Sequence, residues 1–187
     1  MNTFARFLAL GSAVYAASAV AHPLAGVGPG FATGAAHPFQ GLDHALAAIA
    51  VGVWAVRAGR PLSWAAPLLY VAAMLIGCAL GRIMVVPHIE SMLAASVIAL
   101  GLLICVTVKS PRVPLLAIAI FALAHGCAHA LPAHGDAYAY FAGLAAATGT
   151  LLAAGALSAA CLTTRTYYAG AAISLAGMWM LVHVLAL

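Results

Sequence analysis

The side chains of this chain that could do chemistry are its eight histidines and its three acidic residues. His37 and His44 are seven residues apart, about two helical turns, so one helix would present both rings on one face. His125 and His129 are four residues apart, a spacing at which two imidazoles can reach one ion. Asp43 precedes His44, and a carboxylate within an apolar stretch needs a partner or a cation. Because imidazole and carboxylate suit late first-row divalent metals, we predict that these five residues bind one such ion.

Three more residues are predicted metal ligands, and two of them, His22 and His134, are expected to capture the ion outside. If His22 were the mature N-terminus, it could chelate an ion through its α-amine and its ring. Only these two nitrogens would be available, because Pro23 has no backbone N–H to contribute. His134 and Asp136 follow the His125–His129 pair closely and add an imidazole and a carboxylate. For any single histidine taken alone, such as His183, a structural hydrogen bond is the alternative explanation.

The composition predicts the setting of these residues. Hydrophobic residues make up 66% of the chain and charged residues 5%, with a mean hydropathy of +1.14. A soluble domain has about a quarter of its residues charged, so a water-soluble fold is excluded. The apolar runs are about 20 residues long, which suits membrane helices rather than barrel strands. We therefore predict an all-α, polytopic membrane bundle of six transmembrane helices, at 38–56, 63–84, 89–108, 113–132, 138–162 and 167–187.

The first 21 residues have the form of a signal peptide. Arg6 supplies a positive charge, residues 7–20 are apolar, and residues 19–21 read Ala-Val-Ala, an A-x-A cleavage site. We predict cleavage after Ala21, so that the chain divides into a signal peptide (1–21) and a transmembrane domain (22–187). An uncleaved first helix is the alternative.

The distribution of charge predicts the orientation. With the mature N-terminus outside, the first, third and fifth breaks between helices face the cytoplasm, as the positive-inside rule requires. These breaks hold five of the six basic residues that follow position 21: Arg57, Arg60, Lys109, Arg112 and Arg165. We expect a bacterial inner-membrane protein whose histidines and acids lie toward the periplasmic face. The net charge of +4 is explained by this topology and does not indicate nucleic-acid binding.

The chain resembles the HupE/UreJ family of nickel permeases and hydrogenase or urease accessory proteins. Residues 37–44 (HPFQGLDH) fit the family's HPxxGxDH segment, and His22-Pro23 is similar to its N-terminal His-Pro. Residues 125–129 (HGCAH) are similar to its HGxAH stretch, although Ala130 follows where the family usually has glycine. The resemblance implies nickel uptake, with cobalt as a competitor, and a link to the maturation of nickel enzymes.

The donor residues alone leave several functions open. Imidazole also suits zinc and copper, so Ni²⁺, Co²⁺, Zn²⁺ and copper all remain candidate cargo. A metal permease is favoured, and no enzymatic activity is expected. The alternatives are an intramembrane zinc enzyme with a histidine-bound ion and a membrane metal sensor or chaperone without transport. One observation is against transport: the cytoplasmic half of the predicted bundle offers no acid or histidine for release of the ion.

Overall fold

The computed structural model describes residues 30–108, 110–128, 136–162 and 165–186, and this part of the chain is helical without any strand. The elements are α2 (Phe31–Ala36), the 3₁₀ helix η1 (His37–Phe39), α3 (Leu42–Ala58), α4 (Leu62–Leu80), α5 (Ile89–Cys105), α6 (Arg112–Ala128), α7 (Ala137–Leu162) and α8 (Thr166–Leu185). The prediction of an all-α protein is confirmed.

Each predicted apolar run overlaps one of the helices from α3 to α8, with ends that differ by up to four residues among the described residues. Of these, α4, α7 and α8 are long and apolar enough to cross a membrane, and α3 makes a fourth span if it is counted together with α2 and η1. The helices α5 and α6 are apolar and have 17 residues each, at the short end of the range for a membrane-spanning helix. Membrane-spanning helices are therefore present, while the count of six spans remains a prediction.

The first predicted helix, 38–56, is not continuous. The segments Phe31–Phe39 and Leu42–Ala58 meet at an angle of 83°. Pro38 suits the first turn of η1, where its missing N–H is not needed, and Gly41 caps α3 in an extended conformation. The prediction that His37 and His44 share a face of one helix is therefore wrong, because the bend separates them.

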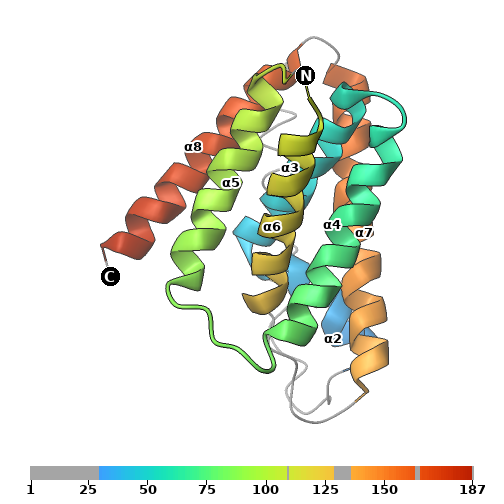
Figure 1. Ribbon diagram of the computed structural model, residues 1–187, viewed down its shortest axis with the longest axis vertical. Coiled ribbons are helices and arrows are strands. Elements are labelled where there is room, and N and C mark those ends of the chain that lie inside the picture. The colour runs from blue at the N-terminus through green and yellow to red at the C-terminus, as the bar shows by residue number, and fades with distance from the viewer. Residues whose placement is uncertain (1–29, 109, 129–135, 163–164, 187) are drawn as a thin grey trace, which may run out of the picture.

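Successive helices alternate in direction along the long axis of the bundle (Figure 1). The starts of α3, α5 and α7 lie near the ends of α4 and α6, at the lower end in this view, where α2 also lies. We call this the histidine end, since it holds His44 and His125. The opposite end, here called the arginine end, carries Arg57, Arg60, Arg112 and Arg165.

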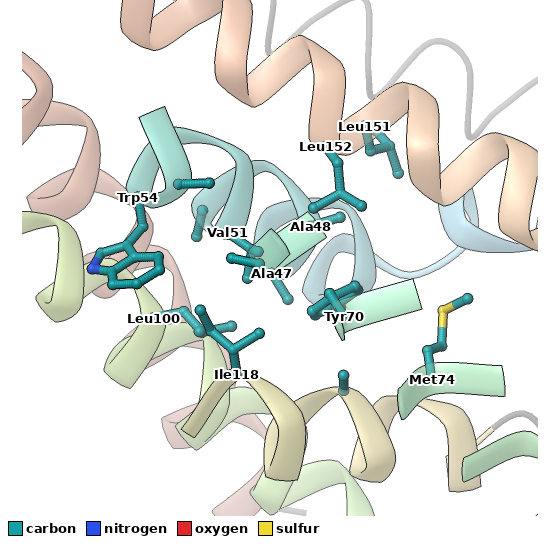
Figure 2. Packing of buried hydrophobic residues seen from close by; sticks show 14 of the residues in the cluster. Ala47, Ala48, Val51, Trp54, Tyr70, Met74, Leu100, Ile118, Leu151 and Leu152 are labelled. Atoms are coloured by element: carbon teal, nitrogen blue, oxygen red, sulfur yellow. The ribbon is translucent and has the colours of Figure 1, made fainter. Parts of the chain in front are cut away.

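The helix α3 forms the centre of the bundle. Ten of its 17 residues are buried, and most of them are alanine, glycine or valine. Figure 2 shows Ala47 and Val51 of α3 among larger side chains of the surrounding helices, including Leu152 of α7 and Ile118 of α6. Small residues on the central helix allow its neighbours to approach closely. The two donors in the first turn of α3, Asp43 and His44, are therefore carried by a helix that its neighbours surround.

The main helix pairs are α3 with α7, α4 with α6, α5 with α8 and α2 with α7. The α4–α6 pair is closest beside His125, where Gly77 and Gly126 face each other. A Cβ atom on Gly126 would lie 2.0 Å from the Met74 carbonyl oxygen, and one on Gly77 would lie 2.2 Å from the Leu123 carbonyl oxygen. Glycine at both positions brings the two backbones into contact and fixes the depth at which α6 carries His125.

Candidate metal centre

Asp43 and His44 occupy the first turn of α3. The Asp43 Oδ1 and His44 Nδ1 atoms are 2.9 Å apart, and both side chains are only 12% exposed. A carboxylate in the first turn is favoured by the positive end of the helix dipole, which offsets part of the cost of its burial. The break before α3 thus places an acid and an imidazole together inside the protein.

His125 reaches the same place from the last turn of α6. Its side chain is fully buried. The centroids of the His44 and His125 rings are 4.7 Å apart, and the rings are almost perpendicular, at 88°. Two residues 81 positions apart in the chain (125 − 44) are therefore neighbours.

Together these residues offer three metal donors at one point. One ligand atom from each of Asp43, His44 and His125 lies within 4.8 Å of the other two. Ligand atoms bonded to one ion at about 2.1 Å can be at most about 4.2 Å apart, so small side-chain movements would bring all three onto an ion. Within residues 30–108, 110–128, 136–162 and 165–186, no other group of three such donors occurs.

A serine that the sequence did not single out supports His125. Ser96 of α5 is fully buried, and its Oγ lies 2.8 Å from His125 Nε2 and 2.7 Å from the Leu93 carbonyl oxygen. The other ring nitrogen, Nδ1, is buried and has no hydrogen-bond partner among the described residues. The sequence does not indicate this contact, because Ser96 lies in an apolar run and its partner comes from another helix.

Gly41 lies directly against the two donors that open α3. A Cβ atom at this position would lie 2.5 Å from Asp43 Oδ1 and 2.7 Å from His44 Nδ1. Both donor atoms approach the backbone so closely here that only a residue without a side chain fits.

His37 lies beside the three donors rather than among them. Its ring centroid is 6.4 Å from that of His44 and 6.0 Å from that of Tyr140 in α7. The 83° bend brings η1 back toward the start of α3, which explains why the two histidines are neighbours although they do not share a helix.

The other predicted ligands are placed apart or lie outside the described residues. Asp136 is exposed, and its Oδ1 accepts the Ala139 N–H at 3.0 Å, an N-cap contact at the start of α7. His22, His129 and His134 lie outside the part of the chain that the structure describes. His183 in α8 stacks on Trp179, with centroids 5.8 Å apart and an angle of 8° between the rings.

A cavity of about 340 Å³ lies at the arginine end, between the ends of α3 and α5 and the starts of α4 and α6. Its lining includes Trp54, Arg57, Thr107 and Pro114, and neither an acid nor a histidine is among the described residues that line it. Arg57 also donates a hydrogen bond to the Thr166 hydroxyl, which ties the end of α3 to the start of α8. The two ends of the bundle therefore differ in chemistry, with metal donors at one and a guanidinium at the other.

Comparison with known proteins agrees with the motifs around these donors. The sequence profile described as HupE / UreJ protein matches residues 9–181. Protein HupE from Rhizobium leguminosarum bv. viciae is 40% identical over 141 residues, which covers 73% of this chain and 74% of that protein. No solved structure matches the chain. The profile spans nearly the whole sequence, including all three donors, and the chain therefore belongs to the HupE/UreJ family.

Proposed function

We propose that this protein is an inner-membrane permease for a divalent transition metal, with Ni²⁺ as its cargo, and that it receives the ion at the histidine end. The observation that carries the proposal is the convergence of Asp43, His44 and His125 within 4.8 Å. Nickel is favoured by family membership, since the donor set itself would also accept Co²⁺, Zn²⁺ or copper. Nickel carried inward would serve the maturation of a nickel enzyme.

Three donors leave coordination positions for other ligands. His37 is near enough to His44 to supply a further imidazole after a side-chain rotation. His129 follows His125 by four residues in the sequence and belongs to the same proposed site. His22, His134 and Asp136 are proposed to capture the ion first, on the periplasmic side. We place the histidine end on that side because the arginine end has the basic residues that the positive-inside rule assigns to the cytoplasm.

The cavity at the arginine end suits a site of release rather than one of binding. Its described lining contains no anionic donor, and the positive charge of Arg57 opposes retention of a cation. An ion that reached this cavity would gain water in place of protein ligands. The asymmetry favours capture at one end and loss of the ion at the other.

The test is metal uptake by purified protein in proteoliposomes, with radioactive nickel outside and Co²⁺, Zn²⁺ or Cu²⁺ as competitors. His44→Ala and His125→Ala should each reduce uptake at least about tenfold, because each removes a direct ligand. His183→Ala is the matched control, since His183 is an exposed histidine stacked on Trp179. Unchanged uptake by both donor variants would contradict the site. Binding without uptake by the unaltered protein would instead indicate a sensor or chaperone.

A further inference from the structure

We propose that Ser96 is a positioning residue of the metal centre, which holds His125 in one tautomer so that Nδ1 is the nitrogen offered to the ion. The proposal rests on the proposed metal site, and it adds a residue from a third helix, α5, to the two helices that supply the donors. Neither the motifs nor the three converging donors require this residue.

The position of the Ser96 proton follows from its two contacts. The hydroxyl has a single proton, and the Leu93 carbonyl oxygen, 2.7 Å from Oγ, can only accept it. The remaining contact of Oγ, to His125 Nε2 at 2.8 Å, must then use an oxygen lone pair. His125 Nε2 therefore carries a proton and donates it to Ser96.

The state of the other nitrogen follows in turn. Neutral imidazole has one N–H, so a proton on Nε2 leaves a lone pair on Nδ1. A doubly protonated ring would bury an N–H at Nδ1, and that atom has no acceptor among the described residues. Only the neutral ring with its proton on Nε2 satisfies the contacts that the structure shows. That form is also the one that can bind a metal, through Nδ1.

The arrangement is the one by which proteins commonly orient a ligating histidine. The nitrogen away from the metal donates its proton to an acceptor, which fixes both the tautomer and the angle of the ring. Here the acceptor is Ser96. Its own hydroxyl proton is donated to the Leu93 carbonyl oxygen of the same helix, so the chain of hydrogen bonds ends on a backbone group. Because Ser96 and Leu93 are both on α5, this helix orients a ring that α6 carries.

The experiment uses the full chain in detergent or nanodiscs, labelled with ¹⁵N-histidine, and compares Ser96→Ala with unaltered protein. Nitrogen chemical shifts of the metal-free protein report which nitrogen of His125 is protonated, and a His125→Gln sample identifies its signals. Calorimetry with Ni²⁺ gives the affinity. Ser96→Ala should lose the preference for Nε2–H and weaken nickel binding by about 10- to 100-fold, the usual effect of removing an outer-shell partner.

Three further variants separate positioning from packing. Ser158→Ala is the matched control, because the Ser158 hydroxyl also donates to a carbonyl of its own helix, Ala154, at 2.7 Å and touches no histidine in the described structure. It should change neither measurement. Ser96→Thr keeps the hydroxyl and should restore both. Ser96→Cys keeps the approximate size of the side chain but offers only a weak acceptor, so it should also lose the Nε2–H preference and bind nickel less tightly. It provides the same test if the alanine variant does not fold.

The outcomes distinguish this proposal from the proposed function. If unaltered protein binds nickel and His44→Ala abolishes binding, but Ser96→Ala and Ser96→Cys keep both the tautomer and the affinity, the role of Ser96 is overturned alone. Loss of affinity with an unchanged tautomer would likewise overturn it, in favour of packing. Unaltered protein that binds no nickel, cobalt or zinc would overturn the metal centre, and the role of Ser96 with it.

Discussion

The close approach of two donor atoms to Gly41 predicts that the metal centre needs a glycine at this position. Gly41→Ala would place a methyl group 2.5 Å from Asp43 Oδ1 and 2.7 Å from His44 Nδ1. Both side chains would have to turn away from the position they now share. We expect nickel affinity, measured by calorimetry, to fall about tenfold or more, as for other changes that misdirect ligands.

Gly149→Ala is the control for this substitution. Gly149 lies within α7, and an added Cβ would meet nothing within 4 Å. Alanine favours helix over glycine by roughly 1 kcal/mol, so this variant should bind nickel normally and be no less stable. If Gly41→Ala binds nickel as well as Gly149→Ala does, the absence of a side chain at Gly41 has no role in the centre.

The sequence was a good guide to the donors and a poor guide to what surrounds them. Asp43, His44 and His125 could be singled out because charged and imidazole groups are costly in an apolar chain and need a reason to be there. Ser96 could not, because a hydroxyl in an apolar helix is cheap, and its partner is 29 positions away. The bond that orients a ligand leaves little trace in local sequence.

The contact between α4 and α6 gives a second prediction. Gly126→Ala would bring a Cβ to 2.0 Å from the Met74 carbonyl oxygen, a backbone atom that cannot move aside cheaply. The helices must separate, at a typical cost for overpacking of about 1–3 kcal/mol. We expect a lower midpoint of thermal unfolding in detergent, together with weaker nickel binding, since His125 is the adjacent residue.

The same Gly149→Ala variant calibrates that measurement, because it makes an identical chemical change in open space. A Gly126→Ala protein with an unaltered unfolding midpoint would show that α4 and α6 are not held at the distance described above.

The six long helices were predictable because each apolar run is bounded by proline, glycine or charge. The bend before α3 was not predicted, although Pro38 and Gly41 lie at it, because proline is equally compatible with the first turn of a continuous helix. Tertiary contacts fix the direction of the bend: α2 packs across α7, where a Cβ on Gly34 would lie 2.0 Å from the Tyr140 carbonyl oxygen and one on Gly143 would lie 2.0 Å from that of Phe31. Contacts of this kind, between segments about a hundred residues apart, decide the path of the chain.

The two unlike ends of the bundle predict its orientation in the membrane. Reporter fusions after Arg60, Arg112 and Arg165 should be active as cytoplasmic fusions, because basic residues are retained on that side. Fusions after Pro87 and Gly135 should be periplasmic. A periplasmic signal from the fusion after Arg112 would reverse the orientation and place the three donors at the cytoplasmic face.

Processing of the chain is tested independently of its fold. Residues 1–21 lie outside the described residues, and the A-x-A sequence at 19–21 predicts that they are removed. Mass spectrometry of the intact purified protein should show His22 at the N-terminus. If the chain retains Met1, the proposed chelation by the α-amine and ring of His22 does not occur, while the site of Asp43, His44 and His125 is unaffected.

The nested pairing of α3 with α7 and of α4 with α6 has a consequence for how the protein is made. Asp43 leaves the ribosome 82 residues before His125 (125 − 43), and α7 follows later still. Translation adds about 5–20 residues per second, so roughly 4–16 s pass between the synthesis of Asp43 and that of His125. During this time α3 lacks the second histidine of the metal site. A chain that stops after residue 136 would contain the three donors and His129 and would still lack α7, the main partner of α3. Such a truncated protein should be inserted into the membrane, fail to hold nickel, and be a substrate for membrane proteases.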